Sequence, residues 1–207
     1  SRDLGLLDEA IADCSQALKL NPRDLEARMC RGMARSAKGL LEDAIDDCTK
    51  ALEVNPRLAL AYYNRGVFRR DKGLLEEAIR DFDAAIDVDP KYALAYVAKG
   101  VAKRNKGLHE EAVRDHTKAV ELDAKLAQAY VNRAAALIDL GSHEKAIAGC
   151  DLALEQNPKY GIAFMNRAVA KMSLGQNESA LVDFGKSIEL SPSPDAFRCR
   201  AIVEFRL

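Results

Sequence analysis

Residues 59–92 read ALAYYNRGVFRRDKGLLEEAIRDFDAAIDVDPKY, and the pattern in this stretch returns along the chain. Its first half looks helical, yet it carries Asn64, Arg65 and Gly66 in its middle. Gly costs about 1 kcal/mol relative to Ala in a helix interior, so its presence there needs a reason. Further on, Lys72 precedes Gly73, and a cation followed by Gly is typical of a helix end. The stretch therefore predicts two helices joined by a turn at Gly73.

The same features recur with a period of 34 residues. The turn glycines are Gly5, Gly39, Gly73, Gly107, Gly141 and Gly175. Two columns of small residues follow, namely Ala10, Ala44, Ala78, Ala112, Ala146 and Ala180, and Ala17, Ala51, Ala85, Ala119, Ala153 and Ser187. Prolines recur as Pro22, Pro56, Pro90, Pro158 and Pro192. Because Pro stops a helix and small residues let helices approach closely, each period predicts a packed pair of helices.

This pattern resembles the tetratricopeptide repeat, a helix–turn–helix unit. The residues that carry the resemblance are Tyr62, Gly66, Gly73, Ala78, Phe82, Ala85 and Pro90, with their equivalents in the other periods. The resemblance implies an all-α fold, a right-handed superhelical solenoid of antiparallel helix pairs with about 12 helices. We expect one solenoid over residues 1–207, with a half repeat at 1–24, full repeats at 25–58, 59–92, 93–126, 127–160 and 161–194, and a final helix at 195–207.

Composition narrows the classes of partner. The net charge of −1 argues against binding along a nucleic-acid backbone, which usually requires a basic stripe. No apolar run approaches the length of a membrane span, so we expect no membrane partner. The five cysteines form no Cys-x-x-Cys pair, which favours reduced thiols in the cytoplasm or another reducing compartment. The chain starts at Ser1 without Met, so we expect a fragment or a processed product.

The histidines and cysteines fall in columns that other repeats fill with packing residues. His109 and His143 stand where other repeats have Leu, and His116 stands in the column of Phe82. Cys14, Cys48 and Cys150 share that column, whereas Cys30 and Cys199 stand in the column of Asn64. Equivalent residues of stacked repeats lie roughly 10 Å apart, which is too far to share a zinc ion. With no phosphate-binding glycine loop either, we expect no catalytic residues, no cofactor, no metal site and no enzyme.

In the tetratricopeptide repeat family, the first helix of each repeat lines a concave surface. Carried over by column, this resemblance gives a candidate peptide-binding groove of Met29, Met33, Leu60, Tyr63, Asn64, Val67, Leu94, Val97, Val101, Val131, Asn132, Met165, Asn166 and Val169. An exposed apolar strip of this kind would mark a binding site. The alternative is that neighbouring repeats bury these residues as ordinary packing. The asparagines either grip a peptide backbone, as in some family members, or merely tolerate an exposed helix position.

One branch of the family binds the C-terminal carboxylates of heat-shock chaperones through Lys and Asn. The corresponding rows here hold Met, Tyr and Val, so a ligand with apolar anchors is favoured instead.

A basic column and an acidic column also recur together. The basic column is Arg31, Arg65, Lys99, Arg133, Arg167 and Arg200, and the acidic one is Asp13, Asp47, Asp81, Asp115 and Asp183, with Gly149 as the exception. Because an unpaired buried charge is costly, we expect a ladder of ion pairs such as Arg65–Asp81. Whether each Arg pairs within its own repeat or with the preceding one stays open. Arg133 should turn to Asp115, since its own repeat has Gly149. The competing interpretation is that these arginines face solvent or a ligand.

The sequence thus favours a non-enzymatic protein–protein interaction scaffold that binds a peptide or helix segment in its concave groove. One alternative is a structural array that self-associates through open solenoid ends. Another is the substrate-recruiting repeat region of a larger protein.

Overall fold

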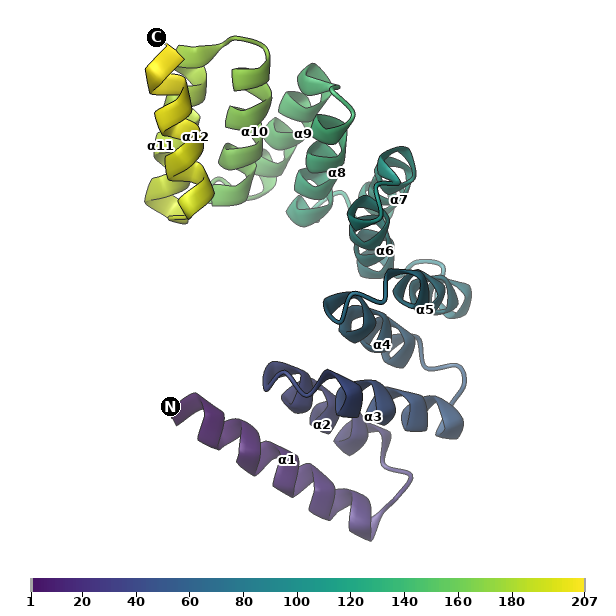
Figure 1. Cartoon of the computed structure of the whole chain (residues 1–207). Coiled ribbons are helices and arrows are strands. Elements are labelled where there is room, and N and C mark those ends of the chain that lie inside the picture. The colour runs from purple at the N-terminus through teal and green to yellow at the C-terminus, as the bar shows by residue number, and fades with distance from the viewer. Residues whose placement is uncertain (1, 207) are drawn as a thin grey trace. The chain divides into compact units, whose positions relative to one another are not determined.

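The computed structural model describes residues 2–206, in which the chain forms twelve α-helices and no strand (Figure 1). The helices are α1 (Arg2–Leu20), α2 (Leu25–Ala37), α3 (Leu41–Val54), α4 (Ala59–Asp71), α5 (Leu75–Val88), α6 (Ala93–Asn105), α7 (His109–Leu122), α8 (Ala127–Asp139), α9 (His143–Gln156), α10 (Gly161–Ser173), α11 (Asn177–Leu190) and α12 (Pro194–Arg206). The chain divides inside α6 into two compact units, one ending at Ala102 and one starting at Lys103.

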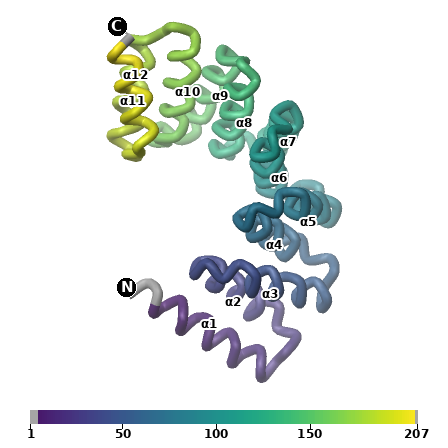
Figure 2. Tube along the Cα trace, in the orientation of Figure 1, coloured from purple at the N-terminus to yellow at the C-terminus, as the bar shows by residue number. Residues whose placement is uncertain are grey.

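Consecutive helices pack side by side from α1 to α5 in the first unit and from α7 to α12 in the second, as the trace in Figure 2 shows for α1 to α4 and for α8 to α12. The first helices of neighbouring repeats also touch, in the pairs α2–α4 and α8–α10. This arrangement is the all-α solenoid of helix pairs that the repeat pattern predicts.

The turn between the two helices of a repeat depends on a glycine with positive φ. At Gly73 φ is 85°, a left-handed conformation that side chains with a Cβ rarely adopt. Its N–H donates to the carbonyl of Arg70 and the N–H of Leu74 donates to that of Arg69, each at 2.8 Å. These two bonds satisfy carbonyls that the end of α4 would otherwise leave unpaired. The other four turn glycines with positive φ are Gly39, Gly107, Gly141 and Gly175.

Gly5 does not make this turn, although it belongs to the same sequence column. It lies inside α1, which begins at Arg2, so the turn expected at Gly5 is wrong. A Cβ at Gly5 would meet no atom within 4 Å, so nothing packs there to require a glycine. The helix continues because neither sterics nor a positive φ interrupts it.

The turn between repeats uses the residue before the proline. The side-chain oxygen of Asn55 accepts a hydrogen bond from the N–H of Arg57 at 3.0 Å, across Pro56. Asp89 does the same for Lys91, also at 3.0 Å. Such Asx turns satisfy a backbone donor where the chain leaves the helix, which explains why Asn or Asp precedes four of the six prolines in this sequence.

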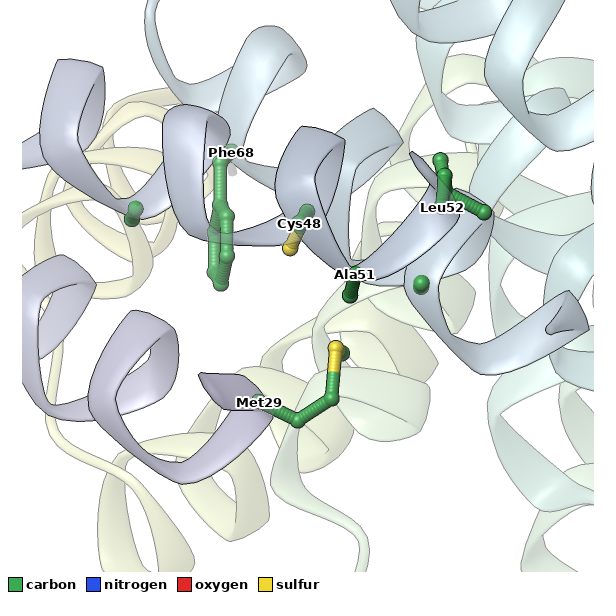
Figure 3. Close-up of a cluster of buried hydrophobic side chains, with 7 residues drawn as sticks. Met29, Cys48, Ala51, Leu52 and Phe68 are labelled. Carbon is green, nitrogen blue, oxygen red and sulfur yellow. The ribbon is translucent and has the colours of Figure 1, made fainter. Parts of the chain in front are cut away.

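The core consists of a series of small clusters of buried hydrophobic side chains between adjacent helices. In Figure 3, Met29 of α2 points toward Cys48 and Ala51 of α3, with Phe68 of α4 beside Cys48. In α4, Gly66 allows a close approach, because a Cβ there would lie 2.6 Å from the ring of Phe82. The unfavourable glycine in the middle of this helix is therefore a packing requirement.

Candidate functional site

The predicted groove residues of the first unit fall into buried and exposed groups. Met29 and Val97 are buried, with 7% and 3% of their surface exposed. Met33, Leu60 and Leu94 are exposed, at 58%, 46% and 39%. Tyr63, Asn64, Val67 and Val101 are half-buried. The column that contains Met29 and Val97 therefore packs between helices here, and the accessible apolar surface is one turn away.

Tyr63 is tied to its neighbours by ring contacts. Its ring centroid lies 5.2 Å from that of Tyr92 and 6.1 Å from that of Phe82, both in tilted geometry. Burial raises the pKa of Tyr63, and burial together with Tyr63 raises the pKa of Tyr92 to about 12. The two tyrosines thus join the end of the loop before α6 to the face of α4.

The predicted groove residues of the second unit are mostly covered. Val131 is 2% exposed, and Asn132 is half-buried. Met165 and Val169 are half-buried and pack on the cluster of Ala168, Ala180, Phe184 and Val203. The Asn166 amide donates to the carbonyl of Val131 at 3.2 Å, so it links α10 to α8. The position of Asn166 thus has a structural use in addition to any role in binding.

One large apolar cavity lies in the first unit, between α1, α2 and α4. Its volume is about 660 Å³, and its lining is Leu7, Leu25, Glu26, Met29, Cys30, Met33, Ala34, Ala37, Leu58 and Leu60. Three of the predicted groove residues, Met29, Met33 and Leu60, are among them. Glu26 is the single charged residue of this lining. We call this feature the α1–α2–α4 groove.

The ion-pair ladder is present in three repeats, in which Arg31, Arg65 and Arg167 each pair with the aspartate of their own repeat. Arg167 also pairs with Asp151 of the preceding repeat at 2.6 Å, and Lys99 of the same column pairs with Asp83 of the preceding repeat at 3.0 Å. Arg65 reaches Asp81 through Nη2 at 2.7 Å and through Nε at 3.1 Å. The corresponding Nη2–Oδ1 distance is 2.6 Å for both Arg31–Asp47 and Arg167–Asp183. The ladder aspartate that each of these three arginines binds is therefore that of its own repeat, and pairs with the preceding repeat occur in addition.

Each of these aspartates also binds a second cation that lies four residues after the first. Asp47 accepts from Arg35 at 2.6 Å, Asp81 from Arg69 at 2.6 Å, and Asp183 from Lys171 at 2.7 Å. Sequence reasoning missed this column, although Arg35, Arg69, Lys103 and Lys171 recur at the repeat period. Burial raises the pKa of Asp183, but hydrogen bonds from Arg167 and Lys171 outweigh it, and the net pKa is lowered.

The expected pair between Arg133 and Asp115 is wrong. Asp115 binds Lys103, the second cation of its own repeat, at 2.8 Å. The guanidinium of Arg133 instead lies over the ring of Tyr130, with Cζ 5.5 Å from the centroid. The reason is geometric. The equivalent arginine Arg167 reaches Asp183 in its own repeat and Asp151 in the preceding one, and the residues at these two positions for Arg133 are Gly149 and Thr117.

The histidines and cysteines lie mostly in packing positions. His116 is fully buried in the column of Phe82, and burial, followed by Arg104 and Arg133, lowers its pKa to about 4. Burial raises the pKa of both Cys48 and Cys150 to about 12. Cys30 is exposed and lines the α1–α2–α4 groove. Among the described residues, no group of three or more His, Cys, Asp or Glu could hold a metal ion.

Sequence comparison agrees with this geometry. The pattern that defines the tetratricopeptide repeat matches residues 2–59, 42–92, 63–127, 127–160 and 162–194. The chain belongs to the tetratricopeptide repeat family. A comparison with curated protein sequences finds no match. In the part of this repeat protein that the structure describes, no helix is long and apolar enough to cross a membrane.

Several solved structures are similar to this chain. YrrB, described as a TPR protein with an unusual peptide-binding site, is 24% identical over 94% of this chain and 98% of its own, with a TM-score of 0.68. TTC0263 from Thermus thermophilus is 22% identical over 87% of this chain and 99% of its own, with a TM-score of 0.70. A chain of the APC/C hetero-tetramer Cut9–Hcn1 gives a TM-score of 0.83 at 18% identity, over 95% of this chain and 39% of its own. At these identities the likeness shows the fold.

Proposed function

We propose that this protein is a non-enzymatic interaction scaffold and that the α1–α2–α4 groove binds a protein segment with apolar side chains. The observation that carries this proposal is the groove itself, which is about 660 Å³ in volume and has one charged lining residue. Met33 and Leu60 expose 58% and 46% of their surface there. Covering apolar side chains that are exposed to water in one concave place lowers the free energy, so such a place favours binding of a partner.

The shape and chemistry of the groove favour a short segment with one or two apolar anchors. Met33 is unbranched and flexible, so it adapts to anchors of different shape. Glu26, at the start of α2, places a negative charge at the edge of the lining and so favours a segment with a basic residue beside its anchor. The likeness to YrrB, a repeat protein described as having a peptide-binding site, supports the same class of ligand.

The test uses Met33→Glu combined with Leu60→Glu, because both side chains are exposed and their replacement need not disturb the core. An array of defined peptides identifies ligands of the unmodified protein, and fluorescence polarisation then measures Kd for both proteins. We expect the double variant to weaken binding by about tenfold or more, since each substitution puts a charge against an apolar anchor. Val97 is unsuitable for this test, because a charge at a residue that is 3% exposed would disturb packing.

The control is Val182→Glu on α11, which changes a residue that is 60% exposed and lies outside the groove. This control should bind like the unmodified protein. Peptide ligands whose affinity survives Met33→Glu with Leu60→Glu would contradict the proposal.

A second candidate function is self-association through α12. Phe197, Ile202 and Phe205 expose 47%, 41% and 93% of their surface, while Val203 on the other side of the helix is buried. Light scattering over a range of concentrations tests this function, with Phe205→Ser as the comparison. A mass that stays monomeric at every concentration would contradict self-association.

A further inference from the structure

The repeat at 127–160 departs from the ion-pair ladder in two places at once. Where other repeats have the paired aspartate it has Gly149, and where they have the second cation it has Leu137. Arg133 is retained. In the three repeats that pair Arg31, Arg65 and Arg167, the arginine is always neutralised by an internal carboxylate. The repeat at 127–160 therefore keeps the arginine that binds a carboxylate but lacks the aspartate that supplies one.

Among the described residues, none forms a hydrogen bond or an ion pair with Arg133, whose guanidinium lies over the Tyr130 ring. The equivalent arginines Arg65 and Arg167 also donate to a second acceptor in the preceding repeat. Arg65 donates to Thr49 at 3.2 Å, and Arg167 donates to Asp151 at 2.6 Å. The corresponding hydroxyl, Thr117, donates to the carbonyl of Val113 at 2.8 Å. A guanidinium with five donors is thus left without a matching acceptor.

The absence of the aspartate leaves a cavity in addition to an arginine without a carboxylate partner. A cavity of about 380 Å³ lies between α7, α8 and α9, lined by Val113, Thr117, Arg133, Leu137, Lys145, Ala148, Gly149 and Leu152. Its lining contains two cations and no acidic residue. A Cβ added at Gly149 would meet Ala134 at 3.6 Å and the carbonyl of Tyr130 at 3.7 Å, which are ordinary contacts. The backbone therefore does not fill the place where the other repeats hold a carboxyl group.

We propose that this cavity is a binding site for a carboxylate supplied by another molecule. The carboxylate takes the place that Asp81 and Asp183 occupy in their repeats, and Arg133 binds it with two parallel N–H donors. Lys145 adds a second positive charge in the role that Arg69 and Lys171 have elsewhere. The walls formed by Val113, Leu137 and Leu152 accept a short apolar stem behind the carboxyl group.

The carboxylate could come from a small free acid or from an acidic side chain of a protein segment. Leu152 and Lys145 are exposed, so the cavity opens to solvent and admits either source. The site lies wholly in the second unit and shares no residue with the α1–α2–α4 groove, so the two proposals stand or fall separately.

The test follows the Nε–Hε NMR signal of Arg133 during titration with sodium acetate, at constant ionic strength maintained with sodium chloride. A second arm uses a short peptide with one Glu between apolar residues, and the same peptide with Gln. We expect acetate and the Glu peptide to shift the Arg133 signal and the Gln peptide to leave it unchanged. A Glu peptide that binds about tenfold more tightly than acetate assigns the site to protein partners, and equal or weaker binding assigns it to small acids.

Variants separate the site from general charge effects. Gly149→Asp supplies the internal carboxylate and should abolish the acetate response, whereas Arg114→Met removes an exposed arginine of α7 and should preserve it. Arg133→Met should abolish binding, measured by calorimetry with the Glu peptide. An Arg133 signal that acetate shifts no more than chloride does, or that shifts equally in Gly149→Asp, would overturn the proposal.

Discussion

Arg65 and Asp81 lie 16 residues apart in sequence and form a two-pronged ion pair inside one repeat, with the Nη2–Oδ1 distance at 2.7 Å. Asp81 is also held by Arg69 at 2.6 Å, and only 4% of its side chain is exposed. Such a carboxylate joins the two helices of its repeat by charge-assisted hydrogen bonds.

Removing this carboxylate should be strongly destabilising. Asp81→Ala leaves two arginines without their acceptor in a mostly buried place, so we expect the free energy of unfolding to fall by about 3–5 kcal/mol. A double-mutant cycle with Arg65→Met and Asp81→Asn, measured by urea unfolding, should show a coupling of about 1–3 kcal/mol. The exposed pair Arg70–Asp71 is the control, for which we expect a coupling below about 1 kcal/mol. Equal coupling in the two pairs would refute a structural ladder.

Glycine substitutions in two helices should have opposite effects. Gly66→Ala places a Cβ 2.6 Å from the Phe82 ring, so overpacking should cost about 1–3 kcal/mol despite the better helix propensity of Ala. Gly185→Ala in α11 meets no atom within 4 Å, and propensity alone should stabilise it by about 0.5–1 kcal/mol. Thermal unfolding of both variants checks the signs. A stabilised Gly66→Ala variant would mean that Phe82 moves aside without cost.

Stability should depend on pH through His116. Its pKa is lowered by burial from 6.5 to about 4, so the unfolded chain binds a proton between these values and the folded protein does not. The contribution of His116 to the free energy of unfolding is therefore fully present above pH 6.5 and is lost as the pH falls toward 4, by an amount on the order of 3 kcal/mol. His116→Phe, which copies the residue of the equivalent position 82, should remove this loss.

Urea unfolding at several pH values measures the effect. Below pH 3.8 a further loss is expected as Asp183, whose pKa is lowered, takes up a proton. An unchanged slope in His116→Phe would show that other groups control acid stability.

Thiol reactivity should separate the cysteines by burial. Cys30 is exposed and should react first with iodoacetamide. Cys48 and Cys150 are fully buried, and their pKa of about 12 keeps them as unreactive thiols near neutral pH. Burial, and then the Cys30 thiol, raise the pKa of Cys14 to about 11, so it should react slowly. Peptide mass spectrometry before and after unfolding in urea measures the order, and early labelling of Cys48 would contradict it.

The sequence by itself determined the repeat and its local chemistry. Gly73 predicted the turn because a positive φ disfavours any residue with a Cβ, and Gly66 predicted a close helix contact because its propensity cost needs a compensating reason. The paired columns of Arg65 and Asp81 predicted an ion-pair ladder, since a buried charge requires a partner. These conclusions follow from single residues and a fixed period.

Only the tertiary structure decided which residues are covered and which partners meet. Met29 and Met33 lie one helical turn apart on the same face of α2, yet the first is 7% and the second 58% exposed. The reason is that Met29 packs in a cluster with residues of α3 and α4, whereas Met33 does not belong to that cluster. Likewise, Asp115 binds Lys103 of its own repeat, and Arg133 lies over the ring of Tyr130 instead. Helix period places a side chain on a face, but the packing of neighbouring helices determines whether that face is buried, paired or open to a ligand.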